Sequence, residues 1–285
     1  MVTPSQAARA AGNTGPQAPR LTKSSQVPGR EAVDVLQDLF GALQSTLTVS
    51  GSIGPSGFDP EFTAKVLMPI VRPLYRAWFR VRTIGIENIP ATGPVILASN
   101  HLSFSDSIFL PIAVPRKITF MAKSEYFEGP GIRGKATAAF FRGAGQVPVD
   151  RTGGNASTAA ISTGVRLLSE GHLLGIYPEG TRSSDGRLYR GKTGVARMAL
   201  EARVPVVPVA MINTEMVQPI GRSRPNFGVE VGIRIGKPLD FSRYYGMEDD
   251  RFVLRSLTDE IMYRIMDLSG QEYVDKYASR SKRPE

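Results

Sequence analysis

The sequence predicts an α/β fold with a mostly parallel central sheet flanked by helices and preceded by an amphipathic N-terminal helical element. Two observations support this prediction. After Pro90, short apolar runs alternate with stretches of helical periodicity, which is typical of a parallel sheet with helices on both faces. Several of these runs also end in polar residues with chemical function, and α/β proteins place active sites where strands end in such turns.

Six apolar runs are expected to form strands, and helices are expected between most of them. The strands are predicted at 95–99, 118–122, 146–149, 173–177, 204–212 and 229–235, and the helices at about 106–113, 130–141, 155–170 and 192–202. A final helix at about 248–268 has Phe252, Leu257, Ile261 and Ile265 at core-facing spacings. The chain has 285 residues, of which 41% are hydrophobic and 21% charged, so it can bury a sizeable core.

Residues 1–30 differ in composition from the rest of the chain. They are rich in Gly, Pro, Ser, Gln and Ala, and they contain four basic residues and no acidic one. Such a segment cannot bury enough apolar surface to order itself. We interpret it as a disordered basic tail, with a targeting signal as the alternative. No apolar run in the sequence approaches the roughly 18 residues that a membrane-spanning helix requires.

Residues 31–82 are expected to form N-terminal helices, and the part from 62 to 81 has an amphipathic pattern. Its cationic stripe consists of Lys65, Arg72, Arg76 and Arg80. Pro69 and Pro73 should kink this helix. It is either an interfacial membrane helix, with cations at lipid phosphates, or a helix packed on the core with a solvated basic face.

Charge and cysteine content limit the function classes. The formal net charge of +9 favours anionic partners such as nucleic acid, anionic lipid surfaces or phosphorylated substrates. No nucleic-acid recognition motif is present, so nucleic acid is not expected as a partner. The chain has no cysteine, which excludes disulfides, thiolate metal sites and a cysteine acyl-enzyme.

His101 is one of two histidines, and it lies in the segment NHLSFSD directly after a predicted strand. A spacing of five residues would place His101 and Asp106 on different faces of a regular helix. If His101 lies in the turn and Ser105 caps the next helix, Asp106 can point back at the imidazole. The carboxylate would then orient the imidazole, and the other ring nitrogen could accept a proton. The alternative is a loop histidine beside a helix-capping acid.

A second polar segment, YPEGTRS at 177–183, follows the predicted strand at 173–177. Gly180 permits a tight turn, and the turn brings backbone amides, a hydroxyl and a guanidinium together. Arg182 can bind two phosphate oxygens, and Thr181 and the turn amides supply further donors. The alternative is an ordinary turn with a surface arginine.

Two further cations follow predicted strands, Lys123 after 118–122 and Arg151 after 146–149. In a parallel sheet they would lie near the same edge as His101 and Arg182. This arrangement predicts a site for a phosphorylated substrate. His172 lies between a helix and a strand at the other end of the sheet, so we exclude it from catalysis.

The segments NHLSFSD, GQVPVDR, YPEGTRS and VPVVPVA occur in this order and together resemble the four sequence blocks of the glycerolipid acyltransferase family, specifically its lysophosphatidic acid acyltransferases. The resemblance covers about residues 83–240. The first and third blocks are specific, whereas the second and fourth are ordinary strand sequences. The family often has Phe where Tyr177 stands.

The resemblance implies transfer of a fatty acyl group from acyl-CoA or acyl carrier protein to 1-acyl-glycerol-3-phosphate, which gives phosphatidic acid. His101 would be the base and Asp106 its orienting partner, with direct attack by the acceptor hydroxyl. The glycerophosphate site would comprise Arg151, Glu179, Gly180, Thr181 and Arg182, and we add Lys123. No metal and no cofactor is expected, because the acyl donor is a co-substrate.

The remaining expectations concern domains, partners and location. Residues 83–270 would form the acyltransferase domain and 271–285 a basic C-terminal tail. The partners would be a lysophospholipid, an acyl donor and an anionic membrane surface, and the protein would be peripheral on the cytoplasmic face of a membrane. Alternatives are the same transfer to glycerol-3-phosphate or another lysolipid, and a non-catalytic protein that binds anionic lipid.

Overall fold

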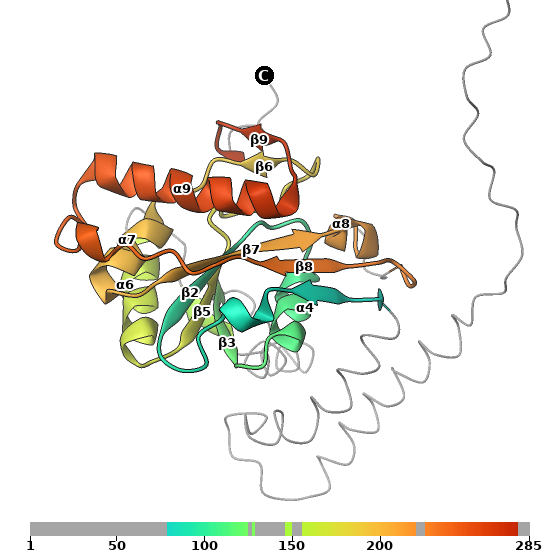
Figure 1. Cartoon of the computed structure of the whole chain (residues 1–285), viewed down its shortest axis with the longest axis horizontal. Helices are drawn as coiled ribbons and strands as arrows, with labels where there is room; N and C mark the ends of the chain where they lie inside the picture. Colours follow the sequence, from blue (N-terminus) through green and yellow to red (C-terminus); the bar gives the residue numbers. More distant parts are fainter. Residues whose placement is uncertain (1–78, 125–126, 129–145, 150–155, 221–225, 279–285) are drawn as a thin grey trace, which may run out of the picture. The chain divides into compact units, whose positions relative to one another are not determined.

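The computed structural model describes residues 79–124, 127–128, 146–149, 156–220 and 226–278 (Figure 1). The expected basic tail at 1–30, the amphipathic stretch from 62 to 78 and the helix at 130–141 lie outside these residues.

A seven-stranded sheet forms the centre of the described part, with the order β1-β8-β7-β2-β5-β3-β4. Its strands are β1 (Arg82–Ile84), β2 (Val95–Ser99), β3 (Ile118–Lys123), β4 (Gln146–Val149), β5 (Leu173–Ile176), β7 (Val206–Ile212) and β8 (Gly232–Ile235). Strands β7, β2, β5, β3 and β4 are mutually parallel. Strand β8 is antiparallel to β7, and β1 is parallel to β8. The predicted mostly parallel sheet is therefore confirmed.

Helices cover both faces of this sheet (Figure 1). They are α4 (Asp106–Ala113), α6 (Ala156–Ser169), α7 (Gly194–Ala202), α8 (Thr214–Val217) and α9 (Arg251–Ser269), with 3-10 turns at Ile86–Asn88 and Ser242–Tyr244. Along β2, Ile96 and Ala98 face the cluster that includes α6, α7 and α9 residues, while Val95 and Leu97 face the cluster that includes α4 residues. All five β2 residues are buried, as expected for a central strand covered on both faces. On α9, Leu257, Ile261 and Ile265 are buried as predicted. Phe252 was also expected to face the core but is 86% exposed, because a spacing of five residues from Leu257 places it on a different face of the helix.

The C-terminal segment differs from the sequence prediction. Residues 271–285 were expected to be a basic tail, but β9 (Tyr273–Val274) pairs in parallel with β6 (Leu188–Tyr189) as a separate two-stranded sheet. The Gln271 side chain also donates to the Gly186 carbonyl at 2.6 Å. Two-residue strands leave no readable alternation in a sequence, which explains why this pairing was missed.

The parallel strands bring three chain segments to one edge of the sheet. Strand β2 ends two residues before His101, β5 ends directly before Tyr177, and β7 ends two residues before Thr214. This carboxyl edge is where open α/β sheets form binding crevices. His172 precedes β5 and therefore lies at the opposite edge, as predicted.

Candidate active site

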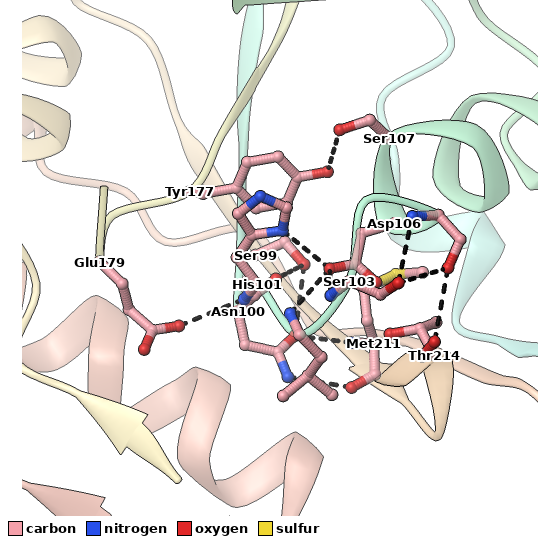
Figure 2. A network of polar contacts seen from close by, with 12 residues as sticks. Ser99, Asn100, His101, Ser103, Asp106, Ser107, Tyr177, Glu179, Met211 and Thr214 are labelled. Atoms are coloured by element: carbon pink, nitrogen blue, oxygen red, sulfur yellow. Dashed lines mark hydrogen bonds and ion pairs between the residues drawn. The ribbon is translucent and has the colours of Figure 1, made fainter. Parts of the chain in front are cut away.

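His101 and Asp106 are hydrogen-bonded at the carboxyl edge of the sheet (Figure 2). The distance between His101 Nδ1 and Asp106 Oδ2 is 2.8 Å, and the exposed fractions of the two side chains are 17% and 0%. Asp106 Oδ2 also accepts two backbone amides, so it is the acceptor in this contact and Nδ1 is the donor. In the neutral imidazole, this tautomer places the lone pair on Nε2. The sequence prediction that Asp106 points back at the imidazole is therefore correct in its geometry.

The turn before α4 wraps around the Asp106 carboxylate. Besides the imidazole, Asp106 Oδ2 accepts hydrogen bonds from the backbone amides of Leu102 and Ser103, both at 2.8 Å. Asp106 is the first residue of α4, where the helix dipole favours a negative charge. The Ser105 hydroxyl, expected to cap this helix, donates instead to Ser103 Oγ and the Thr214 carbonyl. The five-residue spacing thus closes a compact polar loop.

Glu179 connects the two polar segments. Its Oε1 accepts from the His101 amide at 3.2 Å, and its Oε2 accepts from the Tyr189 amide at 2.9 Å. The Ser183 amide donates to the His101 carbonyl at 2.7 Å. Burial raises the pKa of Glu179 to about 7, although the two amide hydrogen bonds oppose this shift. Segment 179–183 therefore holds both backbone polar groups of His101.

Tyr177 stacks on the His101 imidazole, a contact that the sequence did not predict (Figure 2). Burial raises the pKa of the Tyr177 phenol well above its usual range, and the Asp106 charge adds to this shift. The phenol is consequently neutral at physiological pH. In the sequence, Tyr177 was distinguished only because the family that the chain resembles often has Phe at this position.

Asn100 is a second residue that the sequence analysis missed. Its side chain is fully buried, donates to the Met211 carbonyl at 2.9 Å and accepts from the Met211 amide at 2.7 Å. It also donates to Gln271 Oε1 at 2.7 Å. Asn100 thereby ties the start of the His101 turn to β7 and to the C-terminal segment. The sequence indicated Asn100 only through its place between the predicted strand at 95–99 and His101.

The turn expected to bind phosphate lies at the same edge as His101. Gly180 has φ +73°, a left-handed conformation that favours glycine, and Thr181 and Arg182 beyond it are half-buried. A Cβ on Gly180 would lie 2.9 Å from Lys192 Nζ. Lys192 thus brings to this turn a cation that the sequence analysis did not select.

The other two predicted cations are only partly described. Lys123 is the last residue of β3, so its backbone lies at the carboxyl edge, on a strand that pairs with β5. Arg151 lies outside the described residues.

Two searches of the described residues give negative results. Within them, no group of three or more His, Cys, Asp or Glu side chains is arranged to hold a metal ion. No helix among the same residues combines the length and the apolarity needed to cross a membrane.

Comparisons with known proteins give consistent results. The model of the Acyltransferase family matches residues 80–212. The 1-acyl-sn-glycerol-3-phosphate acyltransferase of Bacillus subtilis is 30% identical over 196 residues, which cover 67% of this chain and 89% of that protein. An uncharacterized protein of Mycobacterium tuberculosis is 30% identical over 228 residues, which cover 74% of this chain and 57% of that protein.

A solved structure shares the fold. The crystal structure of the 1-acyl-sn-glycerophosphate acyltransferase PlsC from Thermotoga maritima aligns with a TM-score of 0.55 and 23% identity, covering 90% of this chain and 99% of that one. The chain spans little more than half the length of the mycobacterial proteins that it matches.

Proposed function

Because the chain belongs to the acyltransferase family, we propose that it transfers a fatty acyl group to the free hydroxyl of 1-acyl-glycerol-3-phosphate and so forms phosphatidic acid. The acyl donor would be acyl-CoA or acyl carrier protein, and no other cofactor takes part. The observation that carries this proposal is the 2.8 Å contact between His101 Nδ1 and Asp106 Oδ2, which leaves Nε2 as a base at the carboxyl edge. The named acyltransferase of Bacillus subtilis supports the choice of acceptor.

The reaction needs one proton acceptor. As the acceptor hydroxyl attacks the thioester carbonyl carbon, His101 Nε2 takes the hydroxyl proton and the charged imidazolium is stabilised by Asp106. The tetrahedral intermediate then collapses, the C–S bond breaks, and the leaving thiolate takes the proton from Nε2. The products are an ester and a free thiol, and no acyl-enzyme is formed.

We assign the acceptor phosphate to the turn that follows β5. Thr181, Arg182 and Lys192 supply donors around Gly180, and Lys123 and Arg151 are further candidates from the neighbouring strands. Glu179 was included in this site by resemblance, but both of its oxygens accept backbone amides. We therefore propose that Glu179 supports the backbone of His101 and does not contact phosphate.

We further propose that the protein works as a peripheral protein at an anionic membrane surface on the cytoplasmic side. Four exposed apolar residues support a lipid-facing surface beside the His101 turn: Phe104, Met216, Ile220 and Phe227. The Ser103 hydroxyl donates to the Gln218 carbonyl at 2.8 Å, which joins this turn to the segment after α8. Apolar side chains close to a catalytic edge suit an acceptor that is itself a lipid.

An acceptor panel tests the proposed function. The purified chain is incubated with acyl-CoA or acyl-loaded acyl carrier protein and, in turn, 1-acyl-glycerol-3-phosphate, glycerol-3-phosphate, another lysophospholipid and monoacylglycerol. The released CoA or carrier protein and the lipid product are measured. We expect the largest kcat/KM with 1-acyl-glycerol-3-phosphate. Preference for another acceptor would replace that substrate, and no turnover with any acceptor and either donor would reject the proposal.

A further inference from the structure

The imidazole of His101 lies flat against the ring of Tyr177. The ring centroids are 3.9 Å apart and the planes differ by 9°. Figure 2 shows the phenol ring covering one face of the imidazole while Asp106 holds it at its edge. The phenol ring therefore blocks the approach of a reactant from that face.

Tyr177 is itself held on two sides. Its hydroxyl is 3.0 Å from Ser107 Oγ, and its ring stacks on Phe120 with centroids 5.6 Å apart and planes 18° apart. Phe120 is 3% exposed. A Cβ on Gly175 would lie 2.4 Å from the Phe120 ring, so the glycine leaves the room that Phe120 needs. The stack on His101 is thus supported by residues of α4, β3 and β5.

Two contacts anchored on one helical turn act on the imidazole in different directions. Asp106 fixes the in-plane position of Nδ1, whereas Tyr177, tied to Ser107, opposes rotation of the ring out of that plane. Asp106 and Ser107 are the first two residues of α4. A movement of this helix start would therefore change both contacts together.

We propose that Tyr177 is a positioning residue for the acyl transfer, which fixes the plane of the His101 imidazole and stabilises its protonated form through the face of the phenol ring. This inference depends on the proposed function for its kinetic part and on geometry alone for its structural part. A cation over an aromatic face gains about 0.5–2 kcal/mol. That gain corresponds to roughly a 2- to 30-fold effect on the rate of a step that forms the imidazolium.

Kinetics of Tyr177→Leu, Tyr177→Phe and Ser107→Ala test this role. We expect Tyr177→Leu to lower kcat about 2- to 30-fold with unchanged KM for both substrates. Tyr177→Phe keeps the stack and should restore most of the lost kcat, while Ser107→Ala should resemble Tyr177→Phe. The matched control is Tyr263→Leu on α9, where the exposed tyrosine packs against Tyr273 with the two rings tilted by 59°. An unchanged kcat in Tyr177→Leu, or a loss confined to KM, would overturn the proposal.

Proton NMR of the imidazole tests the geometry without any turnover. The chain has two histidines, so in His172→Gln every histidine ring signal comes from His101. The phenol ring current should shift these signals upfield in the otherwise wild-type chain and in Tyr177→Phe, and the shift should disappear in Tyr177→Leu. If Tyr177→Leu does not fold, the inference is tested by the upfield shift in the otherwise wild-type chain and in Tyr177→Phe, together with the kinetics of Ser107→Ala. Absence of the upfield shift rejects the inference, whereas an upfield shift in a protein without turnover would reject only the proposed function.

Discussion

The backbone amide of His101 donates to Glu179 Oε1 at 3.2 Å, which joins two polar segments that are 78 residues apart in the chain. The Ser183 amide returns a hydrogen bond to the His101 carbonyl. The position of the proposed base is therefore set by the turn after β5 as much as by its own strand. Substitutions in that turn should alter the chemical step even where they contact no substrate.

Glu179→Gln should lower kcat. An amide side chain has one acceptor oxygen, so it can satisfy only one of the two backbone amides, and its NH2 group would face the other. Displacement of His101 should then reduce kcat about 10- to 100-fold, and the unpaired buried donor should reduce stability by roughly 1–3 kcal/mol. Steady-state kinetics and thermal unfolding measure the two effects. A raised KM for the lipid acceptor with unchanged kcat would show that Glu179 contacts substrate instead.

The stability of the protein should depend on pH through Glu179. Its pKa is raised from 4.5 to about 7 in the folded chain, so the folded chain retains a proton that the unfolded chain releases at lower pH. The contribution of Glu179 to stability therefore falls as pH rises from about 4.5 to about 7 and is constant above that range. The total change is on the order of 3 kcal/mol.

Urea unfolding of the wild type and of Glu179→Gln between pH 5 and pH 8 measures this contribution. The wild type should lose stability relative to the variant as pH rises through that window, because the variant lacks the titrating group. Parallel pH dependences for the two proteins would show that Glu179 does not retain its proton on folding.

Arg182→Ala should weaken use of the phosphorylated acceptor. Hydrogen bonds to charged groups contribute about 1.5–3 kcal/mol, so kcat/KM for 1-acyl-glycerol-3-phosphate should fall roughly 10- to 150-fold. The KM for acyl-CoA should stay unchanged, and monoacylglycerol, which has no phosphate, should be used equally by both proteins. Arg166→Ala is the matched control, because Arg166 pairs with exposed Glu170 near the opposite edge. Equal losses with both acceptors would contradict a phosphate role.

Asn100→Ala should destabilise the fold more than it affects substrate binding. The substitution leaves the buried amide and carbonyl of Met211 without their side-chain partner. Each unpaired buried group costs roughly 1–3 kcal/mol, so we expect a loss of about 2–6 kcal/mol in the free energy of unfolding. Chemical denaturation measures it, and a loss below about 1 kcal/mol would mean that water or a shifted backbone replaces these bonds.

The positions and the parallel direction of most strands were predictable from the sequence, whereas β1 and the reversed direction of β8 were not. The apolar runs at 95–99 and 146–149 coincide with β2 and β4, and the helix expected from residue 106 begins at Asp106. Strand β8 is antiparallel to β7. An apolar run has the same pattern in either direction, so the sequence could not indicate this reversal. The strand predicted at 229–235 also starts too early, because β8 begins at Gly232.

The predictable part of the site was the part encoded by short spacing. His101 and Asp106 are five residues apart, so a turn geometry could be inferred from the sequence. The contacts of Glu179 with His101 and of Tyr177 with Ser107 span 78 and 70 residues. Their formation depends on how β2 and β5 are paired, which sequence periodicity does not specify. Arg151 itself lies outside the described residues.

The most direct test of the account compares the two histidines in a single assay. CoA release from acyl-CoA with 1-acyl-glycerol-3-phosphate is measured for the wild type, His101→Ala and His172→Ala, each checked for folding by thermal unfolding. General-base catalysis contributes roughly 10²–10⁴-fold, so His101→Ala should lose about that factor in kcat while His172→Ala stays at the wild-type rate. Equal turnover by folded His101→Ala and His172→Ala would contradict the central claim.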